Sequence, residues 1–220
     1  MSKVIGIIHT TPATIDLIKE QINIYLPDSK VFNIVDDSIL PSLINKSMSI
    51  EKIKQKWFSY AKYLSELDCD IIISACSSVG EIAEEANKFI GKPVIRIDDE
   101  MANQAVLKGS KIAVLATLNT TLEPTKNLIF KKAKQISKEI KIESYIVENA
   151  FEELTKGNKE KHNQLVTEMI LKLKDLYDVI VLAQASMFNI VKDNPKLNVE
   201  NILTSPSSVI RKIKEILESK

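Results

Sequence analysis

Short runs of apolar, often β-branched residues alternate along the chain with longer stretches in which apolar residues recur every three or four positions. The first pattern predicts strands and the second predicts amphipathic helices. Alternation of the two is typical of βα units whose strands form a mainly parallel sheet. We therefore expect an α/β fold, with strands at Val4–Ile8, Lys30–Val35, Ile71–Ala75, Val94–Ile97, Lys111–Leu115, Ile142–Val147, Val179–Ala183 and Asn201–Leu203.

Terminal signals and apolar stripes predict the helices between these strands. Thr11 and Pro12 suit the N-cap and the first position of a helix that follows the first strand. The run Ile71–Ala75 is apolar throughout, as expected for a strand in the middle of a parallel sheet. Further helices are predicted from Ile53 to Leu67, over Gly80–Ile90, from Asp98 or Asp99 to Gly109, and from about Pro206 to Leu217.

The sequence contains an internal repeat at an offset of 108 residues. At this offset Asp70–Ser78 falls on Asp178–Ser186, and aspartate, alanine and serine recur around an apolar strand in both segments. Val4–Ile8 falls on Ile112–Ala116 at the same offset. The position of Cys76 is then equivalent to that of Gln184 in the second half.

The repeat predicts two pseudo-symmetric lobes, each with a parallel sheet of about four strands. We expect residues 1–97 and 205–220 in the first lobe and residues 98–204 in the second. Ligands of such folds bind at the carboxyl ends of the strands. We therefore expect a cleft between the two lobes, with Cys76 and Gln184 facing each other across it.

Composition narrows the class of function. Apolar residues make up 45% of the 220 positions, charged residues make up 27%, and the net charge is +1. Lysine and glutamate are interspersed, so the charge pattern indicates neither nucleic acid nor a membrane as a partner. No apolar run approaches the roughly 18 residues of a membrane span. Two cysteines and a first strand without a preceding signal segment favour the cytoplasm.

Cys76 is the strongest candidate for chemistry. It follows an apolar strand and precedes Ser77 and Ser78 at the start of a predicted helix. Backbone N–H groups at such a start lower the pKa of a thiol and favour the thiolate. The alternative is a small, buried cysteine at a strand end. Cys69 lies between two aspartates that disfavour a thiolate, so we expect it to be structural.

Small hydroxyl residues also follow the other strands. Carboxylate capture is a natural use of such segments, although helix capping explains any single one of them. The four segments that follow these strands are His9-Thr10-Thr11, Thr117-Leu118-Asn119-Thr120-Thr121, Gln184-Ala185-Ser186 and Ser205-Pro206-Ser207-Ser208. His9, Asp36 and Asp37 could assist proton transfer or could be caps and solvated groups. No metal-ligand spacing, G-x-G-x-x-G or Walker motif is present, and Ile82 stands where a phosphatase-like cysteine loop needs arginine.

The segments Ser74–Ser78, Thr117–Thr121 and Leu182–Ser186, with the duplication, resemble the aspartate/glutamate/hydantoin racemase superfamily over nearly the whole chain. The resemblance implies two flavodoxin-like lobes, a final helix that packs on the first lobe, and no metal or pyridoxal cofactor. It also implies one cysteine on each side of the substrate's α-carbon, one taking the proton and the other returning it on the opposite face.

The sequence departs from that pattern at one position. Cys76 matches the first cysteine of the family, whereas Gln184 stands at the place of the second. An amide does not exchange a proton near neutral pH, but it donates and accepts hydrogen bonds. Among relatives, arylmalonate decarboxylases work with one cysteine and maleate isomerase-like enzymes use the first cysteine as a nucleophile, so the resemblance allows several reactions.

The leading hypothesis is therefore a cofactor-independent isomerase or racemase-like enzyme that acts at or near the α-carbon of a small carboxylate through Cys76. A decarboxylase or lyase with one cysteine is an alternative, as is a binding protein that kept the cleft without the chemistry. Whether two chains form a homodimer is left open. The expected ligand contacts come from Thr10, Thr11, Ser77, Ser78, Thr117, Asn119, Thr120, Thr121, Gln184, Ala185 and Ser186, with His9 or Asp36 as assisting groups.

Overall fold

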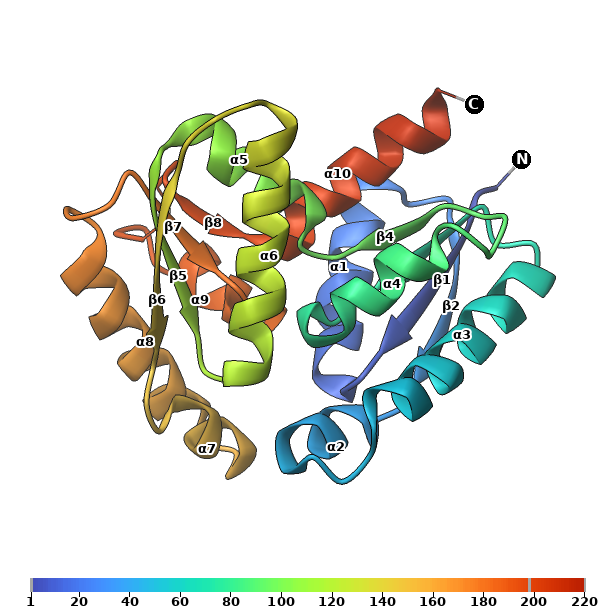
Figure 1. Cartoon of the computed structure of the whole chain (residues 1–220), viewed down its shortest axis with the longest axis horizontal. Coiled ribbons are helices and arrows are strands. Elements are labelled where there is room, and N and C mark those ends of the chain that lie inside the picture. The colour runs from blue at the N-terminus through green and yellow to red at the C-terminus, as the bar shows by residue number, and fades with distance from the viewer. Residues whose placement is uncertain (1, 198, 220) are drawn as a thin grey trace. The chain divides into compact units, whose positions relative to one another are not determined.

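A computed structural model describes residues 2–197 and 199–219. The chain divides into two compact units, Met1–Ile97 with Pro206–Lys220 as unit 1 and Asp98–Ser205 as unit 2. Figure 1 shows that each unit carries its own sheet flanked by helices. All strand pairings in both sheets are parallel, which confirms the α/β fold predicted from the alternation. Across the described residues no helix has the length and apolar character of a membrane span.

Unit 1 is built around a four-stranded sheet in the order β2-β1-β3-β4. Its strands are β1 (Val4–His9), β2 (Lys30–Val35), β3 (Ile71–Ser74) and β4 (Val94–Arg96). Its helices are α1 (Ile15–Tyr25), α2 (Ile39–Asn45), α3 (Ile50–Glu66), α4 (Gly80–Ala86) and α10 (Ser205–Glu218). Two 3₁₀ turns, η1 (Pro12–Thr14) and η2 (Ser77–Val79), follow β1 and β3.

Unit 2 repeats this topology in the order β6-β5-β7-β8. Its strands are β5 (Lys111–Ala116), β6 (Lys141–Ile146), β7 (Val179–Leu182) and β8 (Ile202–Thr204). Its helices are α5 (Asp99–Lys108), α6 (Asn119–Gln135), α7 (Ala150–Thr155), α8 (Lys159–Leu173) and α9 (Phe188–Lys192), and the 3₁₀ turn η3 (Ala185–Met187) follows β7.

Helices cover both faces of each sheet, which explains why the central strands are apolar throughout. In unit 1, Ile5 and Ile7 of β1 pack with α1 and α10, whereas Ile8 packs with α3 and α4. In unit 2, Val114 of β5 packs with α5 and α6, whereas Leu115 packs with α8 and α9. Helix α10 therefore has the same place in unit 1 that α5 has in unit 2, although each follows the last strand of the other unit.

One predicted helix is too long. The helix expected over Gly80–Ile90 ends at Ala86, and the 3₁₀ turn η2 precedes it. Tight bonds close the last turn, because the N–H of Phe89 donates to the carbonyl of Ala86. The side chain of Asn87 then accepts a hydrogen bond from the N–H of Val94 at 2.8 Å. This contact joins the residue after α4 to the first residue of β4.

The strand register corrects one part of the predicted repeat. The offset of 108 residues holds for β3 and β7, since Ile72 pairs with Val94 and Ile180 pairs with Ile202. The first strands differ: Ile71 pairs with Ile5, whereas Val179 pairs with Ile112, an offset of 107 for β1 and β5. The alignment of Val4–Ile8 with Ile112–Ala116 is therefore wrong by one residue, because connecting segments of unequal length separate the strands. Thr10 is consequently equivalent to Thr117.

An aspartate fixes the start of the first strand in both units. Asp70 accepts a hydrogen bond from the N–H of Val4 at 2.8 Å, and Asp178 accepts one from the N–H of Lys111 at 2.8 Å. The pKa of Asp178 lies below its ordinary value because the N–H groups of Lys111 and Ser110 donate to the carboxylate. The aspartate that recurs in the sequence repeat is therefore a structural anchor at the amino edge of each sheet.

Candidate active site

The predicted residues of unit 1 gather at the carboxyl edge of its sheet. Ile8 pairs with Ser74 at the ends of β1 and β3, and the N–H of Ala75 donates to the carbonyl of Ile8. Thr10 and Cys76 therefore leave neighbouring strands side by side. Thr11 lies next to them as the half-buried N-cap of η1, where its hydroxyl accepts from the N–H of Ala13 at 3.4 Å.

Cys76 is a half-buried free thiol that stands at the N-cap of η2. Burial raises the pKa of the thiol above its ordinary value of 9.0. The neighbouring donors, which are the hydroxyl of Thr10, the hydroxyl and N–H of Ser78 and the N–H of Val79, lower it in part. The expectation of a lowered pKa is therefore wrong in its net direction. The expected N–H donors are present, but desolvation of a charged sulfur outweighs them.

Thr10 is the side chain from β1 that faces this thiol. It is 2% exposed, and its Oγ1 has no hydrogen-bond partner among the described residues. Cys76 leaves the neighbouring strand beside it, and donation from this hydroxyl to the sulfur would favour the thiolate and lower the pKa of the thiol.

Gln184 has the equivalent place at the carboxyl edge of unit 2, as the half-buried N-cap of η3. Its Oε1 accepts two hydrogen bonds from Thr117, one from the N–H at 2.5 Å and one from the hydroxyl at 3.0 Å. Thr117 itself is 6% exposed. Thr10 and Cys76 have the equivalent positions in unit 1.

Several predicted loop residues lie in first turns of helices. Asn119, Thr120 and Thr121 begin α6, so the expected loop Thr117–Thr121 is reduced to Thr117 and Leu118. The expected strand-end loop at Ser205 is likewise the first turn of α10. The hydroxyl-rich sequence suits both structures, because the N–H groups of a first turn have no partner within the helix. The remaining predicted contacts lie in the 3₁₀ turns, at Ser77, Ser78, Ala185 and Ser186.

His9 is buried completely, and both of its ring nitrogens have partners within unit 1. Nε2 lies 2.9 Å from Asn33 Oδ1, and Nδ1 lies 2.8 Å from Thr14 Oγ1. An amide oxygen only accepts, so Nε2 carries the proton and Nδ1 accepts from the hydroxyl of Thr14. Burial lowers the pKa of the imidazole, although the bond to Asn33 raises it in part. His9 is therefore a neutral ring that fixes the turn after β1.

Asp36 follows β2 at the same edge and is held by three side chains. It accepts from Lys56 Nζ at 2.9 Å, from Tyr60 Oη at 2.7 Å and from the hydroxyl of Ser38. Burial raises the pKa of its carboxyl, but the bonds from Ser38, Tyr60 and Lys56 more than offset this and lower it to about 2. Asp36 is therefore ionised near neutral pH and has no proton to give.

Cys69 lies in the core of unit 1, fully buried against Gly6. Burial raises the pKa of its thiol, and the charges of Asp70 and Asp68 raise it further. A Cβ at position 6 would lie 3.1 Å from its sulfur, so this cysteine is packed tightly. The geometry agrees with the structural role expected from the flanking aspartates.

Sequence reasoning missed Arg96, a buried guanidinium beside the turn that follows Cys76. Arg96 is 3% exposed, and its guanidinium donates to Glu84 at 2.9 Å. It also packs against the backbone of Gly80, where an added Cβ would lie 2.3 Å from Cζ. A charged residue inside the otherwise apolar strand pattern of residues 94–97 is the signal that could have identified it.

The close approach of Arg96 predicts a destabilising effect of Gly80→Ala. A methyl group that lies 2.3 Å from Arg96 Cζ must displace the guanidinium, and overpacking of this kind costs about 1–3 kcal/mol. In an Arg96→Ala background the clash is absent, and the same substitution should become stabilising, since alanine is the better helix former. Urea unfolding of the four proteins measures this double-mutant cycle. Equal effects of Gly80→Ala in both backgrounds would refute the contact.

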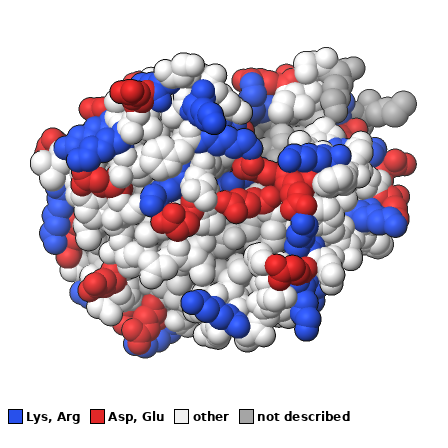
Figure 2. Space-filling model, in the orientation of Figure 1, with Lys and Arg blue, Asp and Glu red and all other residues white. Residues whose placement is uncertain are grey.

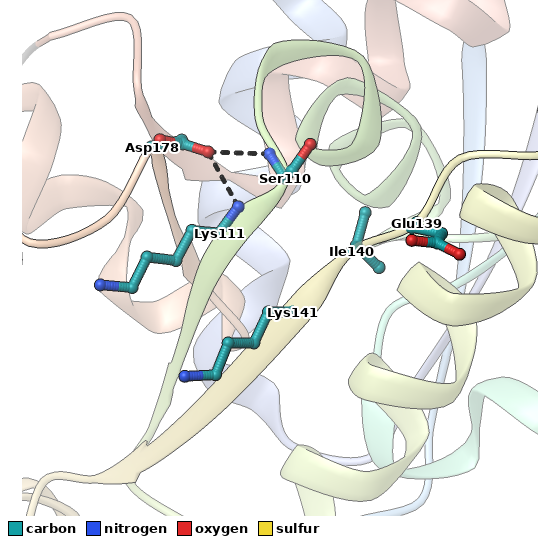
Figure 3. A pocket seen from close by; sticks show the side chains of 6 residues that line it. All are labelled: Ser110, Lys111, Glu139, Ile140, Lys141 and Asp178. Carbon is teal, nitrogen blue, oxygen red and sulfur yellow. Dashed lines mark hydrogen bonds between the residues drawn. The ribbon is translucent and has the colours of Figure 1, made fainter.

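A shallow pocket of about 450 Å³ lies at the opposite, amino edge of the sheet of unit 2. Figure 3 shows Asp178 bonded to the backbone N–H groups of Ser110 and Lys111, with the side chains of Lys111 and Lys141 directed to one side. The lysines have other partners: Lys141 pairs with Glu143 at 2.7 Å, and Lys111 lies over the ring of Tyr177. The residues of this pocket therefore make structural contacts at the amino edge of the sheet, whereas Gln184 lies at its carboxyl edge.

Charges of both signs are interspersed on the face shown in Figure 2. This distribution agrees with the net charge of +1 and gives no extended basic surface on that face. In residues 2–197 and 199–219, no three His, Cys, Asp or Glu side chains are grouped so that they could hold a metal ion.

Comparisons with known proteins place this geometry in a family context. Residues 4–206 match the family described as Asp/Glu/Hydantoin racemase. A glutamate racemase of Bacillus anthracis is 19% identical, with a TM-score of 0.77 over 99% of this chain and 82% of that one. An allantoin racemase of Klebsiella pneumoniae is 15% identical, with a TM-score of 0.71 over 99% and 88%. An aspartate racemase of Picrophilus torridus is 16% identical, with a TM-score of 0.71 over 97% and 95%. No curated protein matches the chain in sequence.

Proposed function

The chain belongs to the Asp/Glu/hydantoin racemase family, and from this premise we propose that it is a cofactor-independent enzyme that moves a proton at or next to the α-carbon of a small carboxylate. Cys76 is the acid–base group. The observation that carries the proposal is the half-buried thiol at the carboxyl edge of unit 1, at the N-cap of η2 and beside the buried hydroxyl of Thr10. A hydroxyl and backbone N–H groups near the sulfur stabilise the thiolate relative to the thiol. This suits a group that takes and returns a proton.

The reaction needs a base and a group that stabilises the charge left on the substrate. The thiolate of Cys76 takes the α-proton, and the electron pair of the C–H bond passes to the carboxylate as an enolate. The amide of Gln184 donates a hydrogen bond to an enolate oxygen. The thiol of Cys76 then returns the proton to the carbon. The role proposed for Gln184 rests on the sequence repeat, which makes its position equivalent to that of Cys76.

The state of the other titratable groups favours protonation on one face. The neutral ring of His9 carries one proton, which it donates to Asn33. Asp36 is ionised and pairs with Lys56. Neither group offers the acid that return of the proton to the opposite face requires. The proposed site therefore exchanges the α-proton with retention, or isomerises its substrate stereospecifically.

Decarboxylation is the second candidate reaction, and Gln184 in place of a second thiol favours it over two-base racemisation. A malonate-type substrate loses carbon dioxide to give the same enolate, and Cys76 then protonates the carbon once. The assisting donor from Gln184 is needed in either reaction. The two reactions differ in the substrate, which carries either an α-proton or a second carboxylate on the same carbon.

A ligand panel tests the proposal directly. We expect thermal stabilisation by at least one small carboxylate in a set of amino acids, dicarboxylates, malonates and hydantoins, because binding to the folded state raises the melting temperature. Any ligand found is then followed by NMR in D₂O for exchange at its α-carbon. A ligand that binds without exchange, isomerisation or loss of carbon dioxide would indicate a binding protein and would contradict the enzyme assignment.

The raised pKa of Cys76 predicts how its reactivity depends on pH. The alkylation rate of the thiol should rise about tenfold per pH unit between pH 7 and 9, with no plateau below pH 9, because the thiolate fraction is still small there. Peptide mass spectrometry after timed iodoacetamide pulses separates Cys76 from Cys69. A plateau near neutral pH would mean that the N–H and hydroxyl donors outweigh the burial.

A further inference from the structure

The two hydrogen bonds from Thr117 determine which way the amide of Gln184 points. A backbone N–H only donates, so the atom that lies 2.5 Å from the N–H of Thr117 must be the amide oxygen. The hydroxyl of Thr117 donates to the same oxygen at 3.0 Å. Both contacts therefore hold the oxygen of Gln184 within unit 2 and turn its NH₂ group away from Thr117.

The NH₂ group of Gln184 has no hydrogen-bond partner among residues 2–197 and 199–219. A flip of the amide would turn the NH₂ group toward the N–H of Thr117, and two donors would then face each other. The side-chain amide of Gln184 therefore presents two N–H donors, and no acceptor, to a ligand.

The corrected register places a threonine at the same point of unit 1. Thr10 and Thr117 are equivalent because β1 and β5 are related by 107 residues, whereas Cys76 and Gln184 are related by 108. Thr10 is 2% exposed, and its hydroxyl has no hydrogen-bond partner in the described chain. Its hydroxyl is therefore available to the sulfur of Cys76, as that of Thr117 is to the oxygen of Gln184.

We infer that Thr10 and Thr117 are a duplicated pair of positioning residues: the unpaired hydroxyl of Thr10 donates to the sulfur of Cys76 when the thiolate forms, and Thr117 fixes Gln184 as a donor of N–H groups. The part that concerns the ligand rests on the proposed function. On the Gln184 side the ligand presents an oxygen acceptor, such as a carboxylate or enolate oxygen, and not a hydrogen to be removed. The threonines touch the acting side chains and not the reacting atoms.

Side-chain amide NMR of the ¹⁵N-labelled full chain tests the Thr117 half without a ligand. The signals of Gln184 are identified by their loss in Gln184→Glu. In Thr117→Val they should move, and exchange of the amide protons with solvent should rise about threefold or more, because one of the two fixing bonds is lost. Thr117→Ser keeps the hydroxyl and should restore the wild-type signals.

Thr155→Val is the matched control, because Thr155 donates to Glu152 on the surface of α7 in the same unit. It should leave the Gln184 signals in place. Unchanged Gln184 signals and exchange rates in Thr117→Val would overturn the inference for unit 2. So would signals that move equally in Thr117→Val and Thr155→Val.

The pH profile of Cys76 alkylation tests the Thr10 half. Thr10→Val should lower the alkylation rate at pH 8 about threefold or more, since the thiolate loses a donor, and Thr10→Ser should restore the rate. A rate in Thr10→Val equal to that of the wild type would overturn this half. Both measurements use the ligand-free protein, so their failure is distinct from failure of the proposed function, which the ligand panel and α-carbon exchange decide.

Discussion

Cys76→Ser should reduce turnover of the substrate by at least about 10³-fold while the fold and ligand binding persist. General acid–base groups contribute typically 10²–10⁴-fold, and a serine hydroxyl is a far poorer base than a thiolate. The side chain is half-buried, and oxygen in place of sulfur leaves no large cavity. The rate of α-proton exchange or product formation at saturating ligand measures the loss, and thermal shift measures the retained binding.

Cys69→Ala is the control for this variant. It removes the other thiol from the core of unit 1, where Cys69 packs against Gly6. The substitution should lower the free energy of unfolding by about 1 kcal/mol through lost packing, and it should leave the turnover number within about twofold of the wild-type value. Full activity in Cys76→Ser would mean that the thiol is structural, and the enzyme assignment would then need another centre.

Gln184→Cys should create α-proton exchange from both enantiomers of the ligand, where the wild type acts on one. The substitution restores the two-thiol arrangement that the family resemblance implies. The N–H and hydroxyl of Thr117, which now hold the oxygen of Gln184, would become donors to the new sulfur. Thr117 would then support a thiolate at position 184 as Thr10 supports one at Cys76. Separate deuterium-exchange rates for the two enantiomers measure the effect.

Gln184→Ser is the matched control for the new thiol. Serine also removes the amide but brings no group that titrates near neutral pH, so exchange should stay confined to one enantiomer and should slow. If Gln184→Cys and Gln184→Ser behave alike, position 184 does not face the reacting carbon, and the pairing of Cys76 with Gln184 would be wrong.

The strands followed from the sequence because each carried its own local signal, whereas the helices α2, α6, α7, α8 and α9 were not predicted. Apolar runs such as Ile71–Ala75 can be satisfied only between two helical layers, and the structure places β3 there within one residue of the expected bounds. Helix α10 showed its apolar stripe in the same way. The constant repeat offset was misleading for β1 and β5. Apolar strands align equally well one residue apart, and only hydrogen-bond partners decide the register.

The candidate site was less predictable, since its chemistry depends on contacts between residues far apart in the chain. The strand-end positions of Cys76 and Gln184 were readable, because parallel strands end at a common edge. The bonds from Thr117 to Gln184 were not readable, because they require the corrected register. Arg96 was missed for a similar reason: its partner Glu84 lies on a helix that packs beside β4 only in the folded chain.

The direction of the pKa of Cys76 shows a further limit of local reasoning. The turn after the strand supplies the N–H donors of Ser78 and Val79, as the sequence suggested. The surrounding unit also removes water from the sulfur, and that loss depends on the whole tertiary structure. A thiol with a raised pKa is a stronger base once ionised, which agrees with a group that removes a weakly acidic proton from carbon.

Deuterium exchange at the α-carbon, followed by NMR in D₂O on separate enantiomers of the bound carboxylate, is the most direct test of Cys76 as the sole thiol base. The wild type should exchange the α-proton of one enantiomer with retention, the other enantiomer should exchange at least about 10²-fold more slowly, and Cys76→Ser should exchange neither. Comparable exchange of both enantiomers by the wild type, or exchange that persists in Cys76→Ser, would contradict the account.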